Sequence, residues 1–339
     1  MVRPMSAAPL LEVRGLTVEF RRDDGVVRAA ERLSFRVDRG EIVGLVGESG
    51  SGKSATALSL LRLVPPPGRI VSGTVTLEGK ELLSLPEKEL RRHRGAGIAY
   101  IPQEPGSALN PVLRVGAQIV DVVRAHRSVT RAEAWREATL ALERVGIPDP
   151  TSRVREYPHQ FSGGMKQRAL IAMALAARPK VLLADEPTTA LDTTLQAGIV
   201  DLLRSLVVGG DLGAMLIITH DLGVVAAVCD RVIVMYAGRI VEEAPVDTLF
   251  ADPRHPYTRA LIESLPRPDV ERGCLPTISG QVPDLARLPS GCPFHPRCGL
   301  ADERCPAWEP ELFPLPDGRR VACIVEEDRR GAREPELAR

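Results

Sequence analysis

The segment Gly47-Glu48-Ser49-Gly50-Ser51-Gly52-Lys53-Ser54 decides the fold. It has a glycine, four residues and then Gly-Lys-Ser, which is the pattern of a phosphate-binding loop. The apolar run Ile42–Val46 before it predicts a buried strand, and residues 54–61 after it predict a helix. Glycines let backbone N–H groups curl around an anion, and the helix N-terminus adds the positive end of a dipole. These flanking elements argue against the alternative, a glycine-rich turn that matches by chance.

Two side chains of this loop have predicted roles on ATP-like ligands. Lys53 is expected to reach the outer phosphates of a nucleotide. Ser54 is expected to offer its hydroxyl to Mg²⁺. The loop therefore predicts a nucleotide site that uses a magnesium ion.

Length and composition limit the class of protein. The chain has 339 residues, enough for about two domains. Its 44 Lys and Arg residues balance its 44 Asp and Glu residues, so bulk attraction to nucleic acid is not expected. No apolar run approaches the roughly 18 residues that span a bilayer. Residues 1–10 lack the apolar core of a signal peptide, so we expect a cytoplasmic protein with reduced thiols.

Three further apolar runs end in polar side chains. Residues 97–103 end at Gln103, residues 181–186 end at Asp185 and Glu186, and residues 215–220 end at His220. Asp185 suits Mg²⁺ or its water shell, and Glu186 suits a base that polarises an attacking water. An ordinary acidic turn is the alternative for this pair. A lone histidine is usually structural, but His220 follows a predicted central strand, where α/β sites collect.

The N-terminal part of the chain has strand patterns. Residues 11–20 and 29–37 alternate apolar and polar side chains, and residues 71–77 form a further short strand. Phe20 is one of six phenylalanines and could stack on a purine, although its spacing alone favours a core or edge-strand residue. Later in the chain, residues 231–242 predict a hairpin.

Residues 104–178 change to helical spacing. Residues 115–125 and 131–145 predict two helices, and the second ends before two prolines. The region closes with Ser162-Gly163-Gly164, which opens an apolar helix over residues 169–177. This is a second helix N-terminus suited to an anion. Two copies of the chain facing each other would explain two phosphate cradles for one nucleotide.

Taken in order, these motifs resemble the ATP-binding subunit of an ABC transporter. The segment 47–54 resembles the Walker A loop, Gln103 the Q-loop, and residues 162–166 the signature. Asp185 and Glu186 resemble Walker B with its catalytic glutamate. Ala190-Leu191-Asp192 resembles the D-loop, and His220 resembles the switch histidine. The family's reference form is Leu-Ser-Gly-Gly-Gln; here the Ser-Gly-Gly core is intact, but Met165 and Lys166 follow it in place of the glutamine.

The resemblance implies an α/β fold over residues 1–265, the ABC ATPase nucleotide-binding domain. Its parts would be a P-loop NTPase core sheet, an antiparallel β subdomain and the helical insert. Glu186 and His220 would be catalytic, and Ser54, Gln103 and Asp185 would hold Mg²⁺. The implied ATP contacts are Phe20, Gly47, Ser49, Gly50, Ser51, Gly52, Lys53, Ser54, Ala55, Gln103, Ser162, Gly163, Gly164, Lys166 and Asp192.

A finer resemblance concerns the importers of dipeptides and oligopeptides. Residues 101–105 with 109–111, and His255–Leu261, are similar to segments of that group. It implies a peripheral subunit on the cytoplasmic face of the membrane. Its partners would be two permeases, a second ATPase subunit and an extracytoplasmic binding protein. Nickel and glutathione importers remain open. A soluble ABC ATPase acting on DNA or ribosomes, or an exporter, fits less well because the chain has one cassette and no fused membrane spans.

The chain beyond Pro266 is rich in proline, cysteine and arginine, and predicts a small Cys-rich domain over residues 266–339 with a solvated tail from Asp328. Four thiols within about thirty residues of a cytosolic protein argue for a metal. They are Cys292, Cys298, Cys305 and Cys323. The resemblance to peptide importers implies a [4Fe–4S] cluster. Zinc and unmetallated thiols stay open. Cys274 is a possible bystander, and Cys229 is expected to be a buried apolar thiol.

Overall fold

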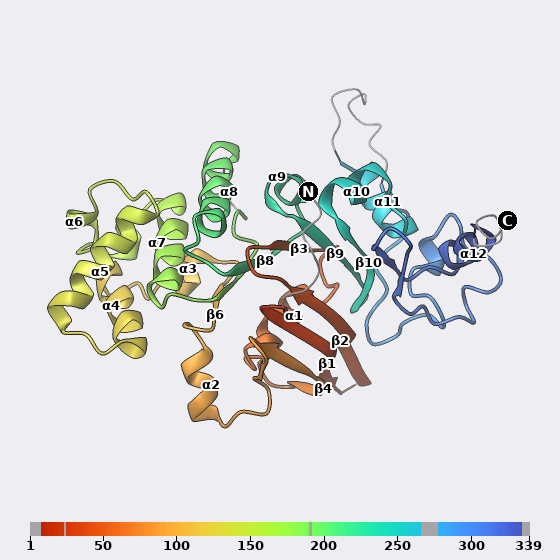
Figure 1. Cartoon of the computed structure of the whole chain (residues 1–339), viewed down its shortest axis with the longest axis horizontal. Coiled ribbons are helices and arrows are strands. Elements are labelled where there is room, and N and C mark those ends of the chain that lie inside the picture. The colour runs from red at the N-terminus through yellow and green to blue at the C-terminus, as the bar shows by residue number, and fades with distance from the viewer. Residues whose placement is uncertain (1–7, 24, 190–191, 266–276, 334–339) are drawn as a thin grey trace. The chain divides into compact units, whose positions relative to one another are not determined.

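The computed structural model divides the chain into two compact units (Figure 1). The structure describes residues 8–23, 25–189, 192–265 and 277–333. The first unit consists of Met1–Val13, Phe35–Ile42 and Thr74–Ile218. The second unit consists of Arg14–Ser34, Val43–Gly73 and Thr219–Arg339. Each unit is therefore assembled from segments that lie far apart in the sequence.

The first unit is built on three parallel strands in the order β8-β7-β6. They are β6 (Ile98–Ile101), β7 (Val181–Asp185) and β8 (Ala214–Thr219). Every residue of β7 and β8 is buried. Parallel strands covered on both faces consist of continuous apolar runs. The strands predicted at residues 181–186 and 215–220 are confirmed to within one residue at each end.

Helices fill the region where the sequence predicts helical spacing. They are α3 (Pro105–Ala108), α4 (Val115–His126), α5 (Arg131–Arg144), α6 (Pro150–Arg153), the 3₁₀ turn η1 (Pro158–Gln160) and α7 (Gly163–Ala176). Helices α4, α5 and α7 pack against one another (Figure 1). At the start of α5, Thr130 and Glu133 form a capping box, which satisfies two free N–H groups and fixes where the helix begins.

The first unit also contains elements that the sequence did not single out. They are α2 (Glu87–His93) and α8 (Thr193–Val208). With 16 residues, α8 is the longest helix among the described residues. Over those same residues, no helix is both long and apolar enough to cross a membrane.

The sheet of the second unit has the order β3-β9-β10-β12-β11. Its strands are β3 (Ile42–Val46), β9 (Arg231–Tyr236), β10 (Arg239–Pro245), β11 (Phe313–Pro314) and β12 (Arg320–Val321). Strands β3 and β9 are parallel, and the remaining pairs are antiparallel. The buried strand predicted before the phosphate loop and the predicted hairpin are both confirmed.

The helices of the second unit are short. They are α1 (Lys53–Leu60), α9 (Leu222–Val228), α10 (Val246–Ala251), α11 (Pro256–Glu263), the 3₁₀ turn η2 (His295–Arg297) and α12 (Ile324–Arg333). Helix α1 directly follows the phosphate loop, as predicted. Helix α11 begins at His255, whose ring caps it.

A separate four-stranded sheet has the order β2-β1-β4-β5. Its strands are β1 (Leu11–Arg22), β2 (Gly25–Val37), β4 (Gly68–Leu77) and β5 (Lys80–Glu81). The strands predicted at residues 11–20, 29–37 and 71–77 are confirmed, and each is longer than predicted. The alternating pattern identifies their centres better than their ends, which lie in more exposed sequence.

The C-terminal region differs from its prediction in two ways. Where the sequence predicts a solvated tail from Asp328, helix α12 continues to Arg333. Strand β12 pairs with β10 through Val321 and Glu242, so the region extends the sheet of the second unit. A separate Cys-rich domain is therefore not confirmed. Helix α12 was missed because its sequence is strongly charged, which resembles the composition of a tail.

Candidate functional site

The phosphate loop joins β3 to α1 through a backbone that requires glycine. Gly47, Gly50 and Gly52 have φ of +154°, +80° and +100°. A Cβ on Gly52 would lie 1.8 Å from the carbonyl oxygen of Ala29, and one on Gly47 would lie 2.2 Å from that of Met235. Neither clash can be relieved by moving a side chain, because both involve backbone atoms. Gly47 and Gly52 are therefore required by packing as well as by conformation, whereas Gly50 is required by its conformation alone.

Lys53 places its ammonium group inside this loop. The side chain is buried, and Nζ donates to the carbonyl oxygens of Gly47 at 2.8 Å and Glu48 at 2.9 Å. Nζ also donates to Ser51 Oγ at 3.4 Å. A cation at the N-terminus of α1 adds to the positive end of the helix dipole. The arrangement fits a phosphate group.

Part of the phosphate loop is exposed to solvent, and part is hydrogen-bonded to a neighbouring turn. Ser49, Gly50 and Ser54 are exposed, and Ala55 is half-buried. The carbonyl oxygen of Ser51 accepts from the N–H of Gly238, in the β9–β10 turn, at 3.0 Å. The hydroxyl of Ser54 is thus open to a ligand such as a magnesium ion.

Phe20, the predicted adenine contact, lies near the end of β1 and is half-buried. Its ring packs on Gly68, where an added Cβ would lie 2.5 Å from the ring. This contact involves the Cε1 and Cζ edge of the ring. Stacking on a purine stays a prediction.

Asp185 ends strand β7 and is almost fully buried. Its Oδ2 accepts from the hydroxyl of Tyr100, on β6, at 2.9 Å. Burial raises the pKa of Tyr100, and the Asp185 carboxylate raises it further. The tyrosine therefore stays protonated and fixes the orientation of the carboxylate.

Glu186 and Gln103 are brought together within the first unit. Gln103 Nε2 donates to Glu186 Oε2 at 3.4 Å, and Thr189 Oγ1 donates to the same oxygen at 2.6 Å. Glu186 has φ of +47°, a conformation that a glutamate rarely adopts. Its N–H donates to the carbonyl oxygen of Ile218 at 2.7 Å, which holds this turn.

The signature segment forms the exposed start of helix α7. Ser162 is the N-cap, and its hydroxyl accepts from the N–H of Met165 at 3.3 Å. Ser162 and Gly163 are exposed, Lys166 is half-buried and Gly164 is buried. The predicted anion-ready helix N-terminus is present.

Two further predicted site residues lie beside helix starts. Asp192 caps α8, with Oδ1 accepting from the N–H of Leu195 at 3.0 Å. His220 is exposed between β8 and Asp221, which caps α9. Residues 190–191 of the predicted D-loop lie outside the described residues.

The cysteines divide into two groups. Cys229 is buried, as predicted. Burial raises the pKa of its thiol, and the negative charge of the nearby Asp230 raises it further. Cys305 and Cys323 are buried, whereas Cys292 and Cys298 are half-buried. All five of these described cysteines are free thiols, and Cys274 lies outside the described residues.

The four C-terminal thiols influence one another electrostatically. Burial raises the pKa of Cys292 to about 11, and charge on Cys323, Cys298 and Cys305 contributes to the rise. The N–H of Cys292 donates to the carbonyl oxygen of Cys305 at 2.9 Å. Among the residues that the structure describes, however, no group of three or more histidine, cysteine, aspartate or glutamate side chains is arranged to hold a metal ion. The cysteines as placed therefore do not form a coordination sphere.

Sequence reasoning missed residues that support the site. Tyr100 is one, since no motif marks a tyrosine near the end of a strand. Arg297 is another: its guanidinium binds the carboxylate of Glu48, in the phosphate loop. The sequence drew attention to this segment only through its cysteines.

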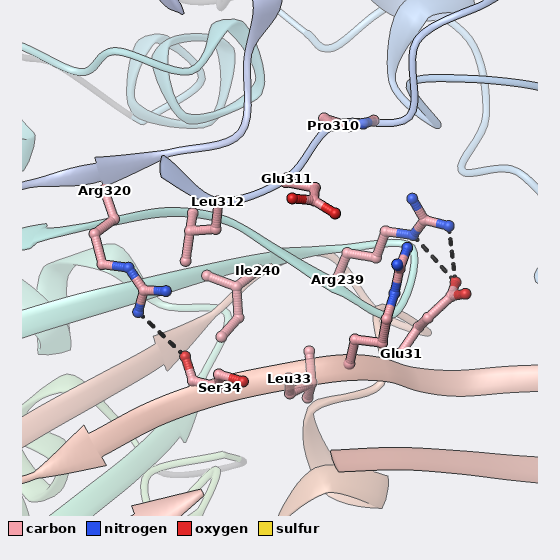
Figure 2. Close-up of a pocket in the computed structure, with 10 residues that line it drawn as sticks. Glu31, Leu33, Ser34, Arg239, Ile240, Pro310, Glu311, Leu312 and Arg320 are labelled. Atoms are coloured by element: carbon pink, nitrogen blue, oxygen red, sulfur yellow. Dashed lines mark hydrogen bonds and ion pairs between the residues drawn. The ribbon is translucent and has the colours of Figure 1, made fainter. Parts of the chain in front are cut away.

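A cavity of about 230 Å³ lies over β2 and β10 in the second unit. Figure 2 shows Arg239 paired with Glu31, at 2.9 Å, and Arg320 donating to the carbonyl oxygen of Ser34, at 3.3 Å. Arg239 also binds Glu309 at 2.6 Å. These arginines are committed to partners within the protein, so the cavity gives no reason to assign it a ligand.

Known families match two stretches of the chain. The family described as "ABC transporter" matches residues 30–189. The family described as "Oligopeptide/dipeptide transporter, C-terminal region" matches residues 241–305. Together they cover the phosphate loop, the signature, Walker B and three of the four C-terminal cysteines.

Curated relatives match nearly the whole chain. The oligopeptide transport ATP-binding protein OppD of Salmonella typhimurium is 48% identical over 321 residues, covering 95% of each chain. The dipeptide transport ATP-binding protein DppD of Escherichia coli is 46% identical over 314 residues, covering 93% of this chain and 96% of the relative.

A solved structure matches the fold. It is the dimeric ATP-binding cassette MJ0796 in a post-hydrolysis state bound to ADP and Pi. The TM-score is 0.62 at 26% identity, over 70% of this chain and 98% of that one. The α/β fold and its phosphate loop are those of an ABC-type ATPase. The chain belongs to the ABC transporter ATP-binding proteins of the oligopeptide and dipeptide family.

Proposed function

We propose that this chain binds and hydrolyses ATP to energise uptake of dipeptides or oligopeptides across the cytoplasmic membrane. The observation that carries the proposal is the 48% identity with an oligopeptide transport ATP-binding protein over 95% of the chain. The family match at residues 241–305 supports it independently, since it lies largely beyond the ATPase motifs.

In this proposal, the phosphate loop binds the nucleotide. Lys53 neutralises the outer phosphates, and backbone N–H groups of residues 47–55 surround them. Ser54, Gln103 and Asp185 would hold Mg²⁺ directly or through water, and the bound ion would neutralise negative charge on the phosphates. The ring of Phe20 contacts the adenine.

Hydrolysis then requires an ordered water. Glu186 accepts a proton from the water as its oxygen attacks the γ-phosphorus, and the bond to the bridging oxygen breaks to give ADP and phosphate. His220 holds the γ-phosphate. The contact of Gln103 with Glu186 at 3.4 Å supports a link between the two residues before the reaction.

The second helix N-terminus supports a head-to-tail pair of ATPase subunits. Ser162, Gly163, Gly164 and Lys166 of one subunit, with Asp192, would contact the ATP held by the loop of the other. The pair would lie peripherally on the cytoplasmic face of the membrane, against two permeases. A homologous ATPase would be the second subunit, and an extracytoplasmic binding protein would deliver the cargo.

The experiment that tests the cargo is reconstitution. The chain is assembled in vesicles with its two permeases and second ATPase, and the binding protein is added with di- or oligopeptide, nickel or glutathione. Of these cargoes, we expect only di- or oligopeptide to stimulate ATP hydrolysis and to accumulate inside the vesicles. Stimulation by nickel or glutathione but not by peptide would contradict the proposal and assign the chain to one of the other importers.

We also propose that Cys292, Cys298, Cys305 and Cys323 hold one metal centre, a [4Fe–4S] cluster. The support is that the four thiols lie in one segment, between residues 292 and 323, and that the N–H of Cys292 donates to the carbonyl oxygen of Cys305 at 2.9 Å. Binding would require the side chains to move into a coordination sphere. The cluster would stabilise a segment with little apolar core. In the same proposal, residues 1–265 form the ATPase domain and residues 266–339 form the Cys-rich domain that holds the cluster.

Protein purified without oxygen tests the cluster. We expect brown protein with about four iron atoms per chain. Cys298→Ser should lose the colour and the iron while ATP binding persists. Zinc as the bound metal, or no metal after anaerobic handling, would contradict the cluster.

A further inference from the structure

Glu48, the second residue of the phosphate loop, is held from outside the loop by two side chains of the same unit. Its carboxylate accepts from Arg297 Nη1 at 2.9 Å and from Nη2 at 3.1 Å. Its N–H donates to the hydroxyl of Tyr257 at 2.8 Å. These partners lie more than 200 positions further along the chain.

Arg297 is held by hydrogen bonds and by two aromatic rings. Its side chain is 6% exposed. Nε donates to the carbonyl oxygen of Ser279 at 2.8 Å, and Nη1 also donates to the hydroxyl of Tyr236 at 3.3 Å. The guanidinium lies 5.8 Å from the ring centre of Tyr236 and 5.9 Å from that of Phe294. A paired guanidinium with so little freedom positions its carboxylate partner firmly.

Tyr257 is equally rigid. Its side chain has no exposed surface. Its ring packs with the rings of Tyr236 and Phe294, with centre-to-centre distances of 4.7 and 5.4 Å. Only the hydroxyl reaches the loop. The three rings therefore form a fixed base from which one polar atom contacts Glu48.

Glu48 passes this restraint to the lysine. Its carbonyl oxygen accepts from Lys53 Nζ at 2.9 Å, so its backbone and side chain are fixed at three points. A loop of small, flexible residues would otherwise sample several conformations, and only some of these would accept phosphate. The apparent affinity of a site falls with the fraction of molecules in the competent conformation.

We propose that Arg297 and Tyr257 are positioning residues for nucleotide binding. They hold Glu48 so that the phosphate loop is preformed, and the C-terminal segment thereby sets the affinity for ATP. The proposal rests on the role proposed above for Lys53. Arg297 ends η2 and directly precedes Cys298.

The test is equilibrium binding of MgATP to the full chain. Arg297→Gln should raise the dissociation constant by about tenfold, since it removes two charge-assisted hydrogen bonds from a partly buried carboxylate. Glu48→Gln should cause a similar loss. The double variant should be no weaker than the stronger single variant, because both changes remove one interaction.

Arg304→Gln is the matched control. Arg304 also directly precedes a cysteine and binds carboxylates, Asp302 and Asp328, but has no contact with the loop among its ion pairs. It should bind ATP like the unmodified chain. Should Arg297→Gln not fold, Tyr257→Phe removes only the hydroxyl and should still weaken binding measurably.

Three results would overturn the proposal. They are unchanged affinity in folded Arg297→Gln, an equal loss in Arg304→Gln, and additive losses in the double variant. Lys53→Ala in the same assay separates the two claims: normal ATP binding by this variant would contradict the role of Lys53, whatever Arg297→Gln does.

Discussion

The sequence predicts a role for Glu186 but not its backbone conformation. Its place after an apolar strand and an aspartate indicated a base. Its φ of +47° could not be predicted, because the left-handed region costs a non-glycine residue about 1 kcal/mol or more. The hydrogen bond from its N–H to Ile218, on a strand distant in sequence, supports this conformation.

Glu186→Gln should leave ATP binding intact and slow hydrolysis. Removing a general base lowers a rate by roughly 10²–10⁴, while the isosteric amide preserves packing and keeps a partner for Gln103 and Thr189. Single-turnover hydrolysis in the assembled transporter measures this effect. Turnover near that of the unmodified protein would remove Glu186 from the proposed mechanism.

At the scale of elements, the length of the apolar run decided which strands could be predicted. Strands β7 and β8 are five and six buried residues long, and their apolar runs predicted them. Strands β11 and β12 have two residues each, too few for any period. They exist because β12 pairs with β10, and such a tertiary pairing leaves no local signal.

Helix α11 supplies a pH-dependent element. His255 caps it, with Nδ1 accepting from the N–H of Tyr257 at 3.0 Å, so the folded protein requires an unprotonated Nδ1. Burial lowers the pKa of His255 from 6.5 to about 3, although a backbone hydrogen bond with Ala322 opposes the shift. Below pH 6.5 the unfolded chain therefore binds a proton that the folded chain does not.

The free energy of unfolding should accordingly fall with acidification. The contribution of His255 is fully present above about pH 6.5 and is lost towards pH 3, at up to about 1.4 kcal/mol per pH unit. Denaturant unfolding at several pH values measures it. His255→Gln should reduce this slope, whereas the exposed His159→Gln should not; equal slopes in all three proteins would contradict the assignment.

At the scale of the whole molecule, local motifs and distant contacts differ in what one sequence reveals. The phosphate loop occupies residues 47–54, so its chemistry can be recognised wherever it occurs. Glu48 and Arg297 form an ion pair although they lie 249 positions apart in the sequence. Nothing in the sequence around either residue indicates that the other is its partner. The class of enzyme was therefore predicted correctly, while the residues that hold its phosphate loop emerged only from the structure.

The most direct test of the account is equilibrium binding of MgATP to the purified full chain and to Lys53→Ala. Lys53 lies at the N-terminus of α1, and its buried ammonium group is the main cation proposed to bind the outer phosphates of ATP. The account predicts saturable binding by the unmodified chain and a loss of about two orders of magnitude or more in the variant, as expected when a charge-assisted contact to phosphate is removed. Equal affinity in a folded Lys53→Ala protein would contradict it.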